Sequence, residues 1–302
     1  MSSDVAEKKV VFVVGTGHSG STLIGLILSS HSQAFGLGEV INIPVAFKQP
    51  SGYPRICLLC DGPCEFWNDR VSSKWLRRWY TPGGRMRQLR SLAMQALRSP
   101  YRNYFAASGC EILVDYSKSL RYARFHALAL QAHRFAQPVL VWNIRDGRAV
   151  LNSYLRKYPD TDVDKWTDVW ITSIEKTERY FDNYSGQKAI VHYDELSNNP
   201  QSTVRTLCET LGLKFEMDML SYWTKDHHIA FGNAGTRSLI SKYRSSIGAD
   251  SPTEDASHEA DFYDDIGLAI RPDIRWRSEL PVEAAERFER RAGRVNMRIT
   301  AL

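Results

Sequence analysis

Short runs of aliphatic and β-branched residues alternate along the chain with longer stretches whose apolar positions recur every three or four residues. The short runs, at 9–14, 110–115, 138–144 and 189–193, are typical of buried strands in a parallel sheet. The longer stretches predict helices at about 21–31, 119–135, 146–157, 164–184, 200–211 and 281–292. This alternation predicts an α/β fold in which a central, mostly parallel sheet is flanked by helices.

Two stretches break this alternation. Residues 45–108 contain three cysteines followed by Trp67, Trp75 and Trp79, and we expect them to form an insertion or lid over the edge of the sheet. Residues 225–265 show neither period and are expected to form a long loop region that contacts cofactor or substrate. We expect neither stretch to fold as an independent domain, so residues 1–302 are predicted to form a single domain.

Composition excludes several classes of protein. With 43% hydrophobic and 24% charged residues in 302, the chain can bury a sizeable core and is not globally disordered. The apolar run after Lys8 and Lys9 ends at Gly15, and no apolar run reaches 18 residues, so we expect no signal peptide, no membrane span and a cytoplasmic location. A net charge of +5 suits a small anionic ligand better than a nucleic acid.

The first predicted strand runs into a glycine-rich loop that opens a helix. Gly15, Gly20 and Thr22 occupy the positions that a phosphate-binding loop requires, but Ser21 stands where the Walker motif has lysine. The glycines still allow backbone N–H groups to surround an anion at the helix N-terminus. The pattern therefore predicts a P-loop-type three-layer fold whose phosphorylated nucleotide is bound without the Walker lysine; an ordinary glycine-rich turn is the alternative.

A second motif follows the predicted strand at 138–144. Arg145 leaves the carboxyl end of this strand, where ligands bind in open α/β sheets, and Ser153 lies two turns along the next helix. A guanidinium and a hydroxyl at this place can bind a second phosphate. Taken alone, the Arg145-Asp146 pair is equally explained as a helix cap.

The two motifs together resemble the cofactor motifs of sulfotransferases, which use 3′-phosphoadenosine 5′-phosphosulfate (PAPS). The segments that carry the resemblance are Gly17-His18-Ser19-Gly20-Ser21-Thr22-Leu23, Arg145-Asp146-Gly147-Arg148-Ala149-Val150 with Ser153, Asp115-Tyr116-Ser117-Lys118, Tyr193-Asp194-Glu195-Leu196, and His228-Ile229 with Gly232, Asn233 and Arg237.

The resemblance implies a set of binding residues. It assigns the 5′-phosphosulfate to the loop Gly17, His18, Ser19, Gly20, Ser21 and Thr22. It assigns the 3′-phosphate to Arg145 and Ser153, and it places Tyr193 near the adenine. Asn233 and Arg237 would add contacts from a late loop. The acceptor of the sulfuryl group is then expected to be a small molecule or a carbohydrate, and the transfer requires no metal.

Sulfuryl transfer needs a base for the acceptor and positive charge for the leaving group. Glu39 is the candidate base, and relatives of this kind resemble the chain in having a glutamate after the first helix. His31 is the rival base, although capping of that helix explains it as well. Lys118 is the candidate cation. His18 stands where relatives carry Lys or Arg, so either His18 acts as an imidazolium or proton donor, or Lys118 supplies most of the charge.

Cysteine spacing gives no complete metal site. Cys57, Cys60 and Cys64 resemble half of a zinc site, but no second cysteine pair or histidine follows at a suitable spacing. We therefore expect free thiols or one disulfide there, a loop role for His227 and His228, and no metal site.

Two other functions stay open: a P-loop kinase or NTPase with a degenerate lysine, and a catalytically inactive nucleotide-binding module. The oligomeric state is not predicted.

Overall fold

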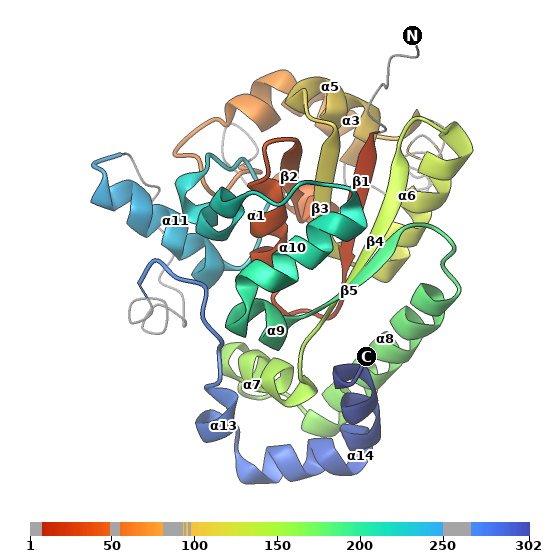
Figure 1. Ribbon diagram of the computed structural model, residues 1–302, viewed down its shortest axis with the longest axis vertical. Coiled ribbons are helices and arrows are strands. Elements are labelled where there is room, and N and C mark those ends of the chain that lie inside the picture. The colour runs from red at the N-terminus through yellow and green to blue at the C-terminus, as the bar shows by residue number, and fades with distance from the viewer. Residues whose placement is uncertain (1–7, 49–54, 81–92, 94, 96–97, 250–266) are drawn as a thin grey trace.

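A computed structural model describes residues 8–48, 55–80, 93, 95, 98–249 and 267–302 (Figure 1). Five strands form one sheet in the order β2-β3-β1-β4-β5, and every neighbouring pair is parallel. The strands are β1 (Lys9–Val14), β2 (Ala34–Gly38), β3 (Ile112–Lys118), β4 (Gln137–Ile144) and β5 (Lys188–His192). The predicted α/β fold is confirmed.

Helices cover both faces of this sheet. The chain moves from β1 through α1 (Ser21–Ser29) toward one sheet edge and from β3 through α6 (Leu120–His133) toward the other. Since crossovers between parallel strands are right-handed, these two helices lie on opposite faces. The remaining helical segments are η1 (Val40–Asn42), α2 (Ile43–Ala46), η2 (Glu65–Arg70), α3 (Ser73–Tyr80), α5 (Tyr101–Ser108), α7 (Gly147–Lys157), α8 (Val163–Asp182), α9 (Tyr193–Asn198), α10 (Pro200–Leu211), η3 (Met217–Thr224), α11 (Ala234–Ser246), α13 (Trp276–Glu279) and α14 (Val282–Thr300).

The central strands form the core. Val10, Val11 and Val14 of β1 have no exposed surface, and Val139 and Val141 of β4 are equally buried. Both faces of these strands are covered by helices, which explains why their sequences read as continuous apolar runs rather than as alternating ones. Among the described residues, no helix combines the length and the apolar character that crossing a bilayer requires.

The described part of the insertion packs onto this same core. The ring of Phe66 in η2 lies 4.2 Å from that of Phe35 in the edge strand β2, and the ring of Tyr101 in α5 lies 5.6 Å from that of Phe12 in β1. Trp67 is fully buried beside Tyr104. Residues 81–92, 94, 96 and 97 of the insertion lie outside the described residues.

Several elements differ from the sequence prediction, among them β2, α11 and α14. The pattern did not predict β2, and α14 runs to Thr300 rather than to about 292. The expectation of a long loop at 225–265 is wrong in part, because α11 occupies Ala234–Ser246. Asn233 caps this helix: its side-chain oxygen accepts a hydrogen bond from the Thr236 N–H at 2.8 Å. The end of that predicted loop region, residues 250–265, lies outside the described residues.

A buried histidine in α6 makes the fold sensitive to acid. His126 has no exposed surface, lies among the rings of Tyr101 and Tyr122, and has no hydrogen-bond partner on either ring nitrogen within the described chain. Burial lowers the pKa of His126 from 6.5 to about 3. The unfolded chain therefore binds a proton below pH 6.5 that the folded chain excludes, so stability falls as the pH drops toward 3.

We expect this single group to remove about 2 kcal/mol from the free energy of unfolding between pH 7 and pH 5. In urea titrations at pH 7 and pH 5, the free energy of unfolding of the variant His126→Leu should therefore fall by about 2 kcal/mol less than that of the parent. His133→Leu, at the end of the same helix, is the control and should behave like the parent. Equal pH dependence in the parent and His126→Leu would contradict the assignment.

Candidate functional site

A pocket lies at the carboxyl ends of the central strands. The loop after β1, the last residue of β3 and the residue after β4 all border it, as expected for ligand sites in open α/β sheets. Residues 269–271 and Asp273 border it as well. The lining residues are Gly17, His18, Gly20, Ser21, Thr22, Leu23, Glu39, Lys118, Arg145, Ser153, Lys157, Tyr193, Tyr222, Gly232, Asn233, Thr236, Leu239, Ala269, Ile270, Arg271 and Asp273.

The glycine-rich loop has a fixed shape. Gly20 adopts a left-handed backbone with φ of 90° at the start of α1, and a Cβ there would lie 2.4 Å from the Tyr193 ring. The Ser19 hydroxyl donates to the Thr16 carbonyl at 2.8 Å, and the Asn143 amide donates to the Ser19 carbonyl at 2.6 Å. These bonds hold the loop so that the first backbone N–H groups of α1 face the pocket.

Arg145 joins the second motif to this loop. Its guanidinium lies over the Tyr193 ring, 4.3 Å from the centroid, and Nη1 donates to the His18 carbonyl at 3.0 Å. The His18 Nδ1 and the Ser153 hydroxyl lie 2.9 Å apart. The two motifs, which stand about 130 residues apart in the sequence, therefore meet across one pocket.

Asp273 lies against the same arginine. Nη2 of Arg145 is 3.2 Å from the Asp273 carboxylate and donates to the Asp273 carbonyl at 3.2 Å. Burial works to raise the pKa of Asp273, but hydrogen bonds from Arg275 and the charges of Arg145 and Arg275 outweigh it and bring the pKa to about 2. A carboxylate thus contacts the cation that the sequence assigns to a phosphate.

Glu39 and Lys118 form an ion pair at the other side of the pocket. The Lys118 ammonium lies 2.5 Å from one carboxylate oxygen of Glu39, and the Asn42 amide donates to the other at 2.9 Å. Gly38, with φ of 82°, brings the chain there, and a Cβ at this position would lie 2.3 Å from the Ala230 carbonyl oxygen. The Glu39 N–H donates to that same oxygen at 2.5 Å. Gly38 therefore allows the close approach that brings the Glu39 carboxylate to the pocket.

His18 is a neutral imidazole at pH 7. Burial, followed by the nearby charges of Lys157, Lys118 and Arg145, lowers its pKa to about 4. His18 and Lys118 also share a left-handed backbone, with φ of 64° and 66°, which is uncommon for residues other than glycine. Of the roles left open for His18, the cationic one disagrees with this environment; Lys118 and Lys157 are the lysines that line the pocket.

Eleven of the thirteen residues predicted from the sequence line this pocket. The two others are Ser19, whose hydroxyl is turned into the loop, and Arg237, whose guanidinium donates to the Leu58 carbonyl at 3.4 Å. The rival base His31 is buried outside the lining, where its Nε2 donates to the Lys214 carbonyl at 2.9 Å. Sequence reasoning missed Lys157, Arg271 and Asp273, which no local motif marks.

The groups that a Mg²⁺–nucleotide site needs have other partners. The Thr22 hydroxyl, which would contact Mg²⁺ in a Walker loop, accepts a hydrogen bond from the Asn233 N–H at 3.0 Å. Asp115 on β3 is buried and accepts from the Tyr101 hydroxyl at 2.5 Å. Among the described residues that line the pocket, the carboxylates are Glu39 and Asp273, and each is paired with a cation.

Comparisons with known proteins agree with this geometry. A sequence profile of the sulfotransferase family matches residues 10–217, which is more than half of the chain. The solved sulfotransferase domain from the Synechococcus PCC 7002 olefin synthase is 17% identical with a TM-score of 0.54, and the match covers 94% of each chain. The sulfotransferase domain from the curacin biosynthetic pathway is 16% identical with a TM-score of 0.52, covering 95% of this chain and 97% of that one. No curated protein sequence matches significantly.

Proposed function

Since the chain belongs to the sulfotransferase family, we propose that it transfers the sulfuryl group of PAPS to a hydroxyl or amine of a small-molecule or carbohydrate acceptor. The observation that carries this proposal is the meeting of two anion-binding motifs in one pocket. PAPS carries a 5′-phosphosulfate and a 3′-phosphate on one adenosine, so it needs two separate anion sites at a fixed distance. The loop after β1 and the Arg145–Ser153 pair supply both.

The side chains suit this donor. Arg145 has a buried Nε without a hydrogen-bond partner in the described chain, as expected of a group that binds an anion. The pocket is lined by the cations Lys118, Arg145, Lys157 and Arg271 against the carboxylates of Glu39 and Asp273. This excess of positive charge fits a nucleotide with several negative charges.

The proposed mechanism is an in-line displacement in which bound PAPS supplies an activated sulfuryl group. Glu39 removes the proton of the acceptor as it attacks sulfur. Lys118, which contacts Glu39, turns toward the sulfonate and neutralises the charge that grows on the bridging oxygen. The N–H groups at the start of α1 bind the departing 5′-phosphate. Neutral His18 donates a hydrogen bond rather than a charge.

The structure does not favour a kinase or NTPase. Ser21 replaces the lysine that reaches the terminal phosphates, and the Thr22 hydroxyl already accepts a hydrogen bond from Asn233. An inactive nucleotide-binding module explains the phosphate sites but gives no role to the Glu39–Lys118 pair.

Lys118 also borders a second groove, between α6 and α8, and we propose that the acceptor enters there. Four further cations line this groove, Arg121, Arg124, Lys176 and Arg179, and no acidic residue does so within the described chain. Trp67, Trp75 and Trp79 line neither cavity. An acceptor with a carboxylate or phosphate would therefore be preferred.

Labelled PAPS tests the proposed function directly. The purified protein is incubated with PAPS and pairs of hydroxyl or amine acceptors that differ by one carboxylate, and both PAP release and label in the acceptor are measured. We expect metal-independent transfer, with a lower KM for the anionic member of each pair. Stoichiometric phosphate release from ATP, with no transfer from PAPS, would contradict the proposal.

Asp273 should weaken the affinity for the 3′-phosphate because its carboxylate competes for Arg145. Removing that charge with Asp273→Asn is expected to tighten PAP binding about fivefold, equivalent to about 1 kcal/mol. Calorimetry measures the affinity, and Asp168→Asn, which removes an exposed partner of Arg291, is the control. Weaker binding in Asp273→Asn would show that the carboxylate positions Arg145 instead.

A further inference from the structure

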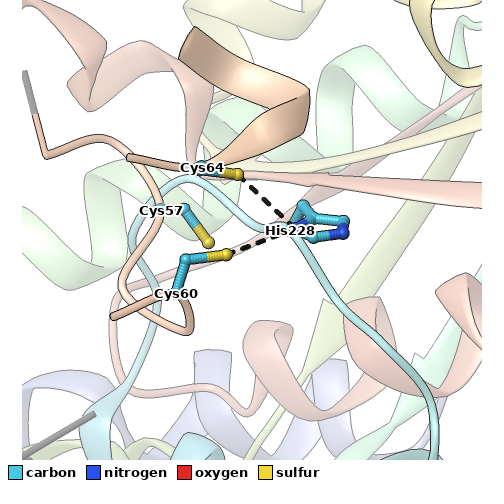
Figure 2. Close-up of side chains that lie close together, drawn as sticks. All are labelled: Cys57, Cys60, Cys64 and His228. Atoms are coloured by element: carbon cyan, nitrogen blue, oxygen red, sulfur yellow. Dashed lines mark hydrogen bonds between the residues drawn. The ribbon is translucent and has the colours of Figure 1, made fainter. Parts of the chain in front are cut away.

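A cluster of three cysteines and one histidine lies outside the pocket. Figure 2 shows the sulfur atoms of Cys57, Cys60 and Cys64 turned toward one another and toward the ring of His228. Their ligand atoms all lie within 4.8 Å of one another. The His228 Nδ1 is 3.3 Å from the Cys60 sulfur and 3.4 Å from the Cys64 sulfur. All three cysteines are free thiols in the structure.

We infer that Cys57, Cys60, Cys64 and His228 bind a zinc ion that ties the cysteine loop to the segment 226–233. The expectation of no metal site rested on the lack of a fourth ligand. The fold supplies that ligand, because it places His228, which lies 164 residues after Cys64 in the sequence, beside the cysteines. Tetrahedral zinc with bonds of about 2.3 Å to sulfur and 2.0 Å to nitrogen places neighbouring ligand atoms about 3.5–3.8 Å apart. The observed separations need only small side-chain adjustments to reach this geometry.

The surroundings of the cluster support the assignment. The Nε2 of His228 lies 3.2 Å from the Asp226 carboxylate, an arrangement that leaves Nδ1 to face the sulfurs and orients zinc-binding histidines in other proteins. The Leu59 N–H points to the Cys57 sulfur at 3.4 Å, and Arg244 donates to the Leu59 carbonyl at 2.5 Å. Three thiolates and one neutral imidazole give a zinc complex a charge of −1, which Arg244 partly offsets.

Zinc binding to these four residues requires no oxidation or reduction. Each thiol loses one proton to solvent as a zinc–sulfur bond forms, and His228 binds through the lone pair of Nδ1 while its Nε2–H donates to Asp226. Four protein ligands fill the tetrahedron, so the site has a structural role and leaves no position for a substrate. The site stands independently of the proposed function.

The segment held by His228 borders the pocket. Trp67 donates from Nε1 to the His228 carbonyl at 2.5 Å, Ala230 bonds to Leu37 and Glu39 through its N–H and carbonyl, and Asn233 donates its N–H to Thr22. Loss of the metal should therefore loosen the segment that supports Glu39 and the phosphate loop. Only this consequence, for nucleotide binding, rests on the proposed function.

Metal analysis of the full-length protein, purified under reducing conditions with added zinc, tests the site. We expect about one zinc ion per chain, which is lost in Cys60→Ser and retained in the control Cys110→Ser, a cysteine outside the cluster. Asp226→Asn should weaken zinc binding about 10- to 100-fold while leaving all four ligands in place. His228→Cys, which keeps four ligands, should restore the metal that His228→Ala loses.

Cobalt substitution gives a readout that does not depend on variants. Cobalt in this site should show the charge-transfer absorption of thiolate ligands and the intense d–d bands of a tetrahedral ion. Zinc-free protein with no cobalt spectrum, stoichiometric iron in place of zinc, or a disulfide among the three cysteines in the purified protein would each overturn the inference. Because these measurements use no nucleotide, their outcome does not depend on whether the protein binds PAPS.

Discussion

Replacing Glu39 with glutamine is expected to lower kcat for sulfuryl transfer about 10³-fold, since general base catalysis contributes on this order and an amide cannot take the proton. Glutamine keeps the shape of the side chain, and its one amide oxygen can still accept from Lys118, although it loses the second acceptor that Asn42 uses in the parent. PAP affinity should therefore stay within about twofold of the parent, because the change removes an interaction made in the transition state rather than in binding.

The measurements are single-turnover transfer rates and PAP calorimetry on the same preparations. Glu216→Gln is the matched control, because this glutamate contacts Ser32 and His31 and does not line the pocket. Normal turnover by Glu39→Gln would place the base elsewhere. Weakened PAP binding together with a normal transfer rate at saturating PAPS would assign Glu39 to the donor site instead.

Replacing Arg145 with alanine is expected to weaken PAP binding about 10²-fold, which corresponds to the loss of about 2–3 kcal/mol from a buried, charged hydrogen-bonding group. A ligand without the 3′-phosphate, adenosine 5′-monophosphate, should bind the parent and the variant with nearly equal affinity. The difference between the two ligands isolates the 3′-phosphate contact.

Arg156→Ala provides the control for a lost arginine on the neighbouring helix α7, since Arg156 pairs with Glu279 and does not line the pocket. Arg145 also bonds to the His18 carbonyl, so thermal unfolding of each variant is measured alongside. If Arg145→Ala weakens the binding of both nucleotides equally, the arginine shapes the pocket but does not bind the 3′-phosphate.

The central strands could be predicted from the sequence because burial on both faces leaves an unbroken apolar run, as in Val10–Val14. β2 escaped prediction because two of its five residues, Gly36 and Gly38, are glycines, which are poor strand formers. α11 escaped because few of its residues are apolar: Leu239 and Ile240 anchor it, and the rest is polar or small.

The site could be predicted where its residues belong to one continuous motif. Gly17–Thr22 and the pair Arg145 and Ser153 are marked by local spacing and by the strand ends that they follow. Asp273 and His228 carry no such mark, because their importance arises only when the fold brings them to Arg145 and to the cysteines. Long-range contacts of this kind have no period or motif from which to infer them.

The most direct test of the account is calorimetry of the purified protein with PAP, with ATP, and with each in the presence and absence of Mg²⁺. The account predicts that PAP binds tightly, with one molecule per chain and no need for Mg²⁺, and that ATP binds far more weakly because it lacks a 3′-phosphate for Arg145. Binding of Mg²⁺–ATP with no binding of PAP would contradict the claim that the two motifs hold one bis-phosphorylated adenosine.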